Sequence, residues 1–378
     1  MNKISVLIPD GENEHVLWVV RSLADSQQVK TCILSDKRWM PVRFSRHCRW
    51  YEFEPTGTDY TARVGALAEM TRRFHIDVIL PVSEEGVQFA ATERGSLSKL
   101  AALSPIPTLE SLRIARNKWL LNQFADQRGV MVPESALVTL DLAFERRISA
   151  LEYPVLLKPT SLTDGQGIRR FETLSDLQRF LESQAAESFK HKSLIQSYVP
   201  GSDMGLSVLC RDGEILAFTI QRGIISAAHR FGPLMAMEFI SQEDVLESGR
   251  KLVSALSWSG VAHIDFRCDS RDGRAKIIEM NARYWGSLLG SLVAGVNFPY
   301  LACLAAQGIP FDRPEYQHTK YAYSTTVIKE ALLWLLGKNT LKGFTYRETG
   351  LRFFLPDPLP EMVKRLGLSA NVGATGEI

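Results

Sequence analysis

The sequence of 378 residues lacks the features that mark several large classes of protein. Its five cysteines lie far apart and form no C-x-x-C pair, so neither a disulfide framework nor a cysteine-ligated zinc site is indicated. Basic and acidic residues nearly balance, 44 against 42, and offer no electrostatic footprint for nucleic acid or an anionic membrane. The opening apolar run, Ile4–Pro9, is too short for a signal-peptide core or a spanning helix. We therefore expect a protein of the reducing cytoplasm, with no membrane span and no nucleic-acid partner.

Two common nucleotide-binding fingerprints are also absent. The P-loop pattern G-x-x-x-x-G-K-[ST] does not occur. Gly165-Gln166-Gly167 has Arg170 where a dinucleotide-binding loop needs its third glycine. These absences argue against a P-loop and against a Rossmann-type cofactor site.

What is present first is a rhythm of alternating strands and helices. Composition is ordinary for a globular protein, and the length favours two or three domains. Strands are predicted at Ile4–Ile8, Lys30–Leu34 and Val78–Pro81, with a helix over Val16–Leu23, which indicates a small parallel sheet covered by helices. Ligands favour the carboxyl ends of such strands, which would bring Ser83-Glu84-Glu85 to a cleft; alternatively, Ser83 only caps a helix.

A lysine ends the next apolar strand. Pro154–Pro159 carries Lys158 near its end, and a buried lysine is costly unless an anion pairs with it. The loop with Gly165, Gln166 and Gly167 follows, and its glycines would let backbone N–H groups approach phosphate oxygens. An ordinary hairpin with a surface lysine is the alternative.

Further along, a strand breaks at a Pro-Gly turn. Gln196 to Val199 precede Pro200-Gly201, and Asp203 follows. The backbone of such a broken strand can read an adenine edge while the carboxylate binds ribose hydroxyls. A simple β-bend explains the same residues.

Charged side chains then interrupt two apolar strands joined by the turn Asp269–Gly273. Asp265 lies in the first strand, and Glu279 and Asn281 lie in the second. Neighbouring strands bring same-face residues together, and two carboxylates with an amide oxygen suit magnesium. Arg283 adds a forked anion binder at the strand end. A structural salt bridge between Glu279 and Arg283 is the competing interpretation.

In this order, the elements resemble the ATP-grasp superfamily, in its carboxylate–amine ligase branch with carbamoyl-phosphate-synthase-like and biotin-carboxylase-like members. The resemblance runs from the first strand to about Pro310 and is most specific at Ile278–Ser287; Ala294–Pro299 is also similar to the family's helix after the metal site. It implies an α/β and α+β fold: a Rossmann-like domain over 1–106, an ATP-grasp domain over 107–310 and a C-terminal extension over 311–378. Within the ATP-grasp domain, a small lid spans about 131–198 and the larger half is an antiparallel sheet.

The resemblance also implies roles for individual residues. Lys118 and Lys158 would contact the ATP phosphates, and the Gly165–Ile168 loop would close over them. Gln196, Ser197 and Val199 would hold adenine, and Asp203 would hold ribose. One or two magnesium ions, or manganese, would bind Asp265, Glu279 and Asn281, while Arg283 would stabilise the acyl phosphate. Three positions depart from the commonest pattern, since Asp203, Asp265 and Gln196 stand where Glu is frequent; none removes a necessary group, so an active site is expected.

The implied activity is an ADP-forming ligase that activates a carboxylate, of amino-acid or peptide type, as an acyl phosphate and joins it to an amine. Candidate substrate-binding residues are Arg222, His229, Arg230 and Arg283, against solvated surface for the first three. His263 shares a face with Asp265 and either helps to bind a substrate anion or is a hydrogen-bonded core histidine.

Other interpretations stay open. A bicarbonate- or carbamate-activating ATP-grasp enzyme shares the Glu-x-Asn-x-Arg run, and a non-catalytic nucleotide-binding protein is a third option. The apolar stretch Ile328–Leu336 could be a dimer surface or pack internally. Homodimers occur in the family, but neither the oligomeric state nor the carboxylate and amine follow from the sequence.

Overall fold

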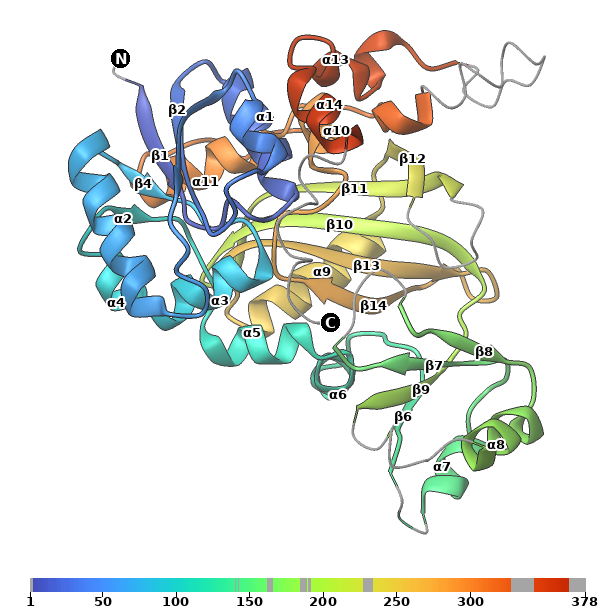
Figure 1. Ribbon diagram of the computed structural model, residues 1–378. Coiled ribbons are helices and arrows are strands. Elements are labelled where there is room, and N and C mark those ends of the chain that lie inside the picture. The colour runs from blue at the N-terminus through green and yellow to red at the C-terminus, as the bar shows by residue number, and fades with distance from the viewer. Residues whose placement is uncertain are drawn as a thin grey trace.

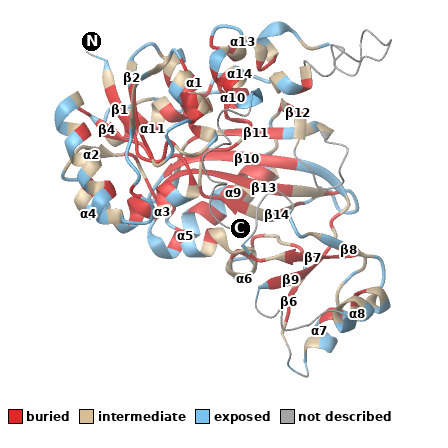
Figure 2. Cartoon of the chain, viewed as in Figure 1, coloured by how far each residue is buried: buried red, intermediate tan, exposed pale blue. Residues whose placement is uncertain are grey.

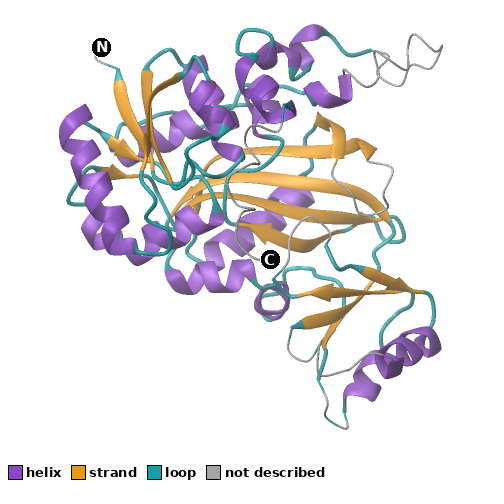
Figure 3. Ribbon diagram, in the orientation of Figure 1, coloured by secondary structure: helices purple, strands orange, loops and turns teal. Residues whose placement is uncertain are grey.

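The computed structural model describes residues 3–139, 141, 143–161, 166–183, 189, 192–226, 234–327 and 343–366. Within these ranges the chain forms three sheets (Figure 1, Figure 3). One is parallel and the other two are antiparallel, as expected for an ATP-grasp fold preceded by a Rossmann-like unit. Gly165, His229, Arg230 and Ile328–Leu336 lie outside the described residues.

The parallel sheet has the strand order β3-β2-β1-β4-β5. Its strands are β1 Ile4–Ile8, β2 Val29–Ser35, β3 Cys48–Phe53, β4 Val78–Ile79 and β5 Ala102–Leu103. Its helices are α1 His15–Asp25, η1 Pro41–Phe44, α2 Tyr60–Phe74, α3 Glu84–Thr92 and α4 Arg94–Leu97. Ser83 caps α3 by accepting the Gly86 N–H, so the capping interpretation of this residue is confirmed. Asp10, buried after β1, accepts the Ser83 N–H and thereby ties β1 to the loop before α3.

A small antiparallel sheet has the order β6-β9-β7-β8 (Figure 1, lower right). Its strands are β6 Ser135–Leu137, β7 Val155–Pro159, β8 Arg169–Phe171 and β9 Ser193–Ser197, and α7 Phe144–Ser149 and α8 Leu174–Ser183 accompany it. Val155 and Leu157 of β7 and Ile195 of β9 pack against these helices in a separate core. Because Val155 and Leu157 point to that core, the alternation of a strand turns Lys158 to the other face.

The largest sheet has the order β14-β13-β10-β11-β12-β15. Its strands are β10 Gly201–Arg211, β11 Glu214–Ser226, β12 Leu234–Phe239, β13 Gly260–Asp269, β14 Ala275–Asn281 and β15 Lys320–Ala322. Leu206, Ile264 and Met280 belong to one core with α5 Leu109–Arg116, α6 Lys118–Asp126 and α9 Glu243–Ala255, so these helices cover one face of the sheet. The strands β10 and β13 are buried over most of their length (Figure 2).

The other helices of the described ranges follow β14 or lie near the C-terminus. They are α10 Leu288–Val293, α11 Phe298–Ala306, η3 Tyr346–Glu348, α13 Leu351–Phe354 and α14 Leu359–Arg365. Trp285, Leu288 and Phe298 share a core with α1, which joins this part of the chain to the parallel sheet.

The sequence predicts a helical stretch over Leu109–Gly129 that is closed by Gly129 and has Lys118 inside it, but the structure divides this stretch into α5 and α6. Asn117 adopts an extended conformation between them, and its side chain accepts the N–H groups of Trp119 and Leu120. An asparagine side chain that satisfies the open N–H groups of a new helix favours such a break. Gly129, at φ 67°, ends the stretch as predicted. The break makes Lys118 the first residue of α6 rather than a residue inside a helix.

The chain passes from the small sheet to the large one between β9 and β10. Gly201 opens β10 at φ 131°, and a Cβ atom built there would lie 1.8 Å from the carbonyl oxygen of Cys268. Only glycine fits this close approach of two backbones. The predicted Pro-Gly break is therefore the point where one sheet ends and the other begins.

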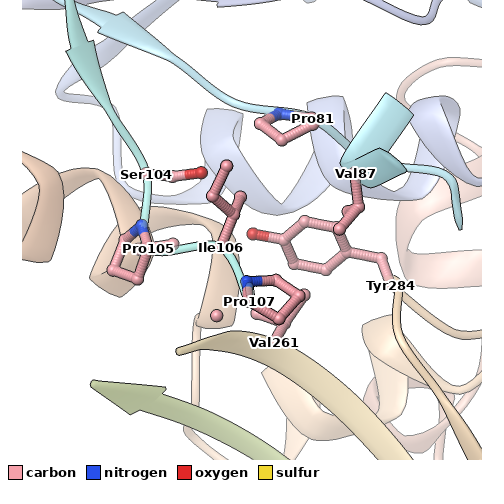
Figure 4. Close-up of a pocket in the computed structure, with 10 residues that line it drawn as sticks. Pro81, Val87, Ser104, Pro105, Ile106, Pro107, Val261 and Tyr284 are labelled. Carbon is pink, nitrogen blue, oxygen red and sulfur yellow. The ribbon is translucent and has the colours of Figure 1, made fainter. Parts of the chain in front are cut away.

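Tyr284, three residues after the end of β14, contacts the part of the chain that forms the parallel sheet. Its N–H donates to the Val82 carbonyl at 3.2 Å, and its ring is buried against the segment Ser104–Pro107 (Figure 4). The cavity at this seam has a volume of about 10 Å³, far below that of a small-molecule site. This junction is thus a packed contact between the first sheet and the strand end.

None of the helices within the described ranges combines the length and apolar character that crossing a membrane requires.

Candidate functional site

Residues from the small sheet, the large sheet and α6 converge between the two antiparallel sheets. Lys118, at the start of α6, places its Nζ 2.9 Å from Glu279 Oε2 on β14. Lys158, on β7, donates from Nζ to Gln196 Oε1 on β9 at 2.7 Å. The Lys118 N–H also donates to the Thr160 carbonyl, directly after β7. The two predicted phosphate-binding lysines therefore enter the same space from two different elements.

Burial and charge shape the ionisation of these groups. Burial lowers the pKa of Lys158 to about 8, although the nearby Glu279 acts in the opposite direction. Burial alone would raise the pKa of Glu279, but the ammonium groups of Lys118 and Lys158 hold that pKa below its usual value. The site thus combines an ionised carboxylate with a lysine whose charged form is destabilised by burial. A bound polyanion would stabilise the charged form of that lysine.

Gln196 is buried and faces Lys158. Its Nε2 donates to Ser135 Oγ at 3.1 Å, and Asn122 of α6 donates to the same hydroxyl. This network fixes the carboxamide so that its oxygen is directed at the ammonium group. Gln196 therefore stands as a partner of Lys158 in this structure, a role that its position in the sequence does not reveal.

Ser197 and Val199 lie at the crossing between the sheets, where the adenine contacts were expected. The Ser197 N–H donates to the Glu134 carbonyl, and the Val199 carbonyl accepts from Arg267 Nε at 3.1 Å. The Ser197 N–H and the Val199 carbonyl, which were expected to contact adenine, therefore already have hydrogen-bond partners within the protein. Asp203, two residues into β10, is about half exposed and accepts from Arg267 Nη1 at 2.7 Å.

Arg267 is a site residue that the sequence reasoning missed. Besides Asp203 and Val199, its guanidinium contacts the Gly201 carbonyl and lies over the ring of Tyr198. Arg267 therefore holds the connecting segment between β9 and β10 in place through contacts with residues 198–203. The available signal was its spacing of two residues from Asp265, which puts both on one face of β13.

The predicted metal ligands are together on adjacent strands. Asp265 is paired directly with Glu279 in the register of β13 and β14. Asn281 Nδ2 lies 2.9 Å from Asp265 Oδ2 and 3.4 Å from Glu279 Oε1. Desolvation raises the pKa of Asp265, while the neighbouring His263 opposes that shift. Carboxylate and amide oxygens are the ligands that magnesium or manganese prefers, so the two carboxylates and the nearby amide oxygen of Asn281 fit such an ion, although here the amide nitrogen is the atom that faces the carboxylates.

That set is incomplete by itself. Within the described ranges, no group of three or more His, Cys, Asp or Glu side chains is arranged to hold a metal ion. Magnesium commonly completes its shell with water and phosphate oxygens, which a nucleotide supplies. The geometry therefore suits an ion that arrives with a phosphate ligand.

Arg283 borders the same group. Its Nη2 lies 3.3 Å from Asn281 Oδ1, and its Nη1 donates to the Tyr284 carbonyl. The competing interpretation was a salt bridge between Glu279 and Arg283. In the structure Glu279 instead forms an ion pair with Lys118, and Arg283 contacts Asn281 and Tyr284.

The remaining predicted residues are less closely associated with this group. Arg222 on β11 pairs with Glu238 at 2.6 Å, and it is opposite Met204, whose side chain belongs to the core under α9. The alternation of the strand therefore turns Arg222 to the face away from Asp265. Gln166 and Gly167 lie in an exposed turn before β8, with Gly167 at φ 72°. Gly165, His229 and Arg230 are outside the described residues.

Comparisons with known proteins agree with this architecture. The family described as the ATP-grasp domain matches residues 115–287. The multifunctional protein pyr-3 of Neurospora crassa is 26% identical over 304 residues, which cover 77% of this chain but 15% of that protein. The matched part of the chain therefore spans about a seventh of that relative's length.

Two solved structures share the fold. An L-amino acid ligase from Bacillus licheniformis has a TM-score of 0.59 at 19% identity, covering 82% of this chain and 75% of its own. The biotin carboxylase domain dimer of the Hydrogenobacter thermophilus 2-oxoglutarate carboxylase, solved with MgADP and bicarbonate, has a TM-score of 0.62 at 18% identity and covers 84% and 73%. The family match includes both lysines and both carboxylates, and it covers every strand of the two antiparallel sheets except β15. Residues 115–287 of this chain are thus similar in sequence to the ATP-grasp domain, and the chain shares the fold of solved ATP-dependent enzymes of this architecture.

Proposed function

We propose that this protein is an ATP-dependent ligase that activates a carboxylate as an acyl phosphate and joins it to an amine, with release of ADP and phosphate. The observation that carries the proposal is the convergence of Lys118, Lys158 and Glu279 with Asp265 and Asn281 between the two antiparallel sheets. Cations from one side and oxygen ligands from the other suit a magnesium nucleotide.

The reaction requires positioning and charge neutralisation more than a nucleophilic side chain. A substrate carboxylate oxygen would attack the γ-phosphorus of ATP, ADP would leave, and an amine would then displace phosphate from the acyl carbon. Lys118 and Lys158 would bind the phosphates, and Arg283 would stabilise charge on the acyl group. One or two magnesium ions held by Asp265, Glu279 and Asn281 would neutralise charge on the phosphates.

The finer assignments belong to the same proposal. Asp203, with Arg267, would border the ribose, and the segment Gln196–Val199 would border adenine. The proposed division is a Rossmann-like unit (1–106), an ATP-grasp unit (107–310) and a C-terminal extension (311–378) that contributes β15 to the large sheet. The substrates would be small molecules, the protein would act in the cytoplasm, and a homodimer is compatible with the assembly named for the biotin carboxylase structure.

Activation of bicarbonate is the second candidate function. It is favoured by the structural likeness to a biotin carboxylase domain that was solved with bicarbonate. The two candidates share the nucleotide site and differ in the anion that receives the phosphoryl group. A substrate panel therefore has to include bicarbonate.

The test is ADP release by the full chain with magnesium-ATP and a panel of amino acids, dipeptides, other carboxylates and bicarbonate. Hydroxylamine is added to trap acyl phosphate as a hydroxamate. A hydroxamate formed with one carboxylate supports the ligase, and ADP release that depends on bicarbonate without a hydroxamate supports the second candidate. Failure to bind magnesium-ATP would rule out both.

Glu279→Gln is the matched control because it keeps the size of the side chain and removes its charge. It should lower substrate-dependent ADP release by about 100-fold, since it weakens a metal ligand and the partner of Lys118. Undiminished turnover in this variant would contradict the assigned metal site.

A further inference from the structure

A row of polar residues continues from the metal-ligand group into the large sheet. Across the strands, Ser207 of β10 is paired with His263 of β13, and His263 with Asn281 of β14. One row further along, Gly205, Asp265 and Glu279 are paired in the same way. The residues between them point into the core under α9, so both rows share the face that carries the site.

The contacts along this row are continuous. Ser207 Oγ is 2.9 Å from His263 Nδ1, and His263 Nε2 is 3.4 Å from Asp265 Oδ1. A carboxylate can only accept a hydrogen bond, so the proton of a neutral imidazole belongs on Nε2, and Nδ1 accepts from the serine hydroxyl. The other oxygen of Asp265 accepts from Asn281. Both oxygens of this carboxylate therefore have a donor that fixes their direction.

The imidazole ring has little freedom to move. Trp285 stacks on it at 5.6 Å between ring centroids and an interplanar angle of 21°, and both side chains are buried. On the opposite strand, a Cβ atom at position 205 would lie 2.7 Å from Cε1 and 2.9 Å from Nε2 of the imidazole. A glycine there leaves just the space that the ring fills. Ser207 is fully buried, and its hydroxyl contacts Nδ1, on the side of the ring away from Asp265.

These contacts exceed what a core histidine needs. A buried imidazole that only fills space requires partners for its two nitrogens, and any carbonyl would serve. Here one nitrogen faces a carboxylate that also belongs to the metal-ligand group, and the other is held by a serine dedicated to it. Second-layer partners of this kind orient metal ligands and tune their affinity.

We propose that His263, held in place by Ser207 and Trp285, is a positioning residue that orients the Asp265 carboxylate for the metal ion. The inference rests on the proposed function for the identity of the metal site and adds to it the group that sets the direction of one ligand. His263 acts through Asp265 and contacts neither the nucleotide nor the substrate.

The experiment measures Mn²⁺ binding to the full chain in the presence of saturating ADP, by titration calorimetry or by the enhancement of water-proton relaxation. His263→Phe keeps an aromatic ring for Trp285 and removes both nitrogens, whereas His263→Gln keeps an N–H donor. We expect Phe to weaken Mn²⁺ binding by about 10- to 100-fold, and Gln to recover most of that loss. ADP affinity without metal and the melting temperature are measured in parallel, and the metal-free ADP affinity should change less than about twofold.

Ser207→Ala provides a second route if a position-263 variant does not fold. It removes a single oxygen atom and leaves the imidazole and Trp285 in place, and it should weaken Mn²⁺ binding by several-fold. Equal losses of Mn²⁺ affinity in His263→Phe and His263→Gln, or unchanged Mn²⁺ affinity in Ser207→Ala and His263→Phe, would overturn the positioning role. Absence of Mn²⁺–ADP binding by the wild-type chain would instead overturn the proposed function, and the inference with it.

Discussion

Lys158 shows how the surroundings of one residue set the pH range of a site. Its ammonium group is buried, and the oxygen that accepts its hydrogen bond, Gln196 Oε1, is neutral. Because burial penalises the charged form, the pKa falls from 10.5 to about 8. Below pH 8 the lysine is charged in both the folded and unfolded chain. Between pH 8 and 10.5 the unfolded chain holds a proton that the folded chain has released, so this group makes the free protein more stable as pH rises through that window.

Nucleotide binding should show the opposite pH dependence. Only the protonated lysine attracts phosphate, so we expect the dissociation constant for magnesium-ATP to be flat near pH 7 and to rise above about pH 8, by at most about tenfold per pH unit. Equilibrium binding between pH 6.5 and 9.5 measures this rise. Lys158→Arg, which stays charged, should remove the dependence, and Lys158→Met should bind about 10- to 100-fold more weakly at neutral pH. A wild-type profile parallel to that of Lys158→Arg would contradict the assignment of Lys158 to the phosphates.

At the scale of elements, the crossing between β9 and β10 depends on one backbone conformation. Gly201 combines a positive φ with the closest approach to the Cys268 carbonyl. Gly201→Ala should therefore lower the free energy of unfolding by about 2 kcal/mol or more, because the new methyl group must displace a backbone. Urea denaturation measures the change.

Gly65→Ala is the matched control for that substitution. Gly65 lies inside α2, and nothing is within 4 Å of its Cβ position. Alanine should stabilise the helix there by about 0.5–1 kcal/mol. If both variants shifted the urea midpoint in the same direction, the requirement for glycine at the crossing would be refuted.

How far the elements follow from the sequence depends on whether their signals are local. The strand Ile4–Ile8 and the hairpin carrying Asp265 and Glu279 were predictable because apolar runs and turn residues mark them within a few positions. The break at Asn117 was missed because the residues on both sides have helical spacing, and the cap forms only once α6 begins. Likewise Gln196 could be placed near the site, but its orientation depends on Ser135 and Asn122, which are distant in the chain.

At the scale of the whole molecule, the C-terminal segment 343–366 is tied to the first unit of the chain. Asp357 is buried and accepts from Arg21 Nε at 3.1 Å, from Ser45 Oγ at 2.8 Å and from the Arg46 N–H at 2.9 Å. Arg21 also donates to Glu361 of α14. Partners more than 300 residues apart leave no local pattern, so the sequence indicated a C-terminal extension but not this attachment. The contact connects α14 to α1 and η1, and through α1 to the core shared with Trp285.

Asp357→Ala tests whether this attachment stabilises the fold. The substitution leaves the buried guanidinium of Arg21 without its carboxylate at that position, and breaking a buried pair costs about 3–5 kcal/mol. We expect a loss of that size in urea unfolding and faster proteolytic cleavage within 343–366. Lys364 of α14 forms an exposed ion pair with Glu14, which precedes α1. Lys364→Ala removes this pair and should change the free energy of unfolding by less than about 0.5 kcal/mol. Equal effects of the two substitutions would show that the segment is held by its apolar contacts, such as Phe353 in the core with Tyr321, and that Asp357 contributes no more than a surface charge.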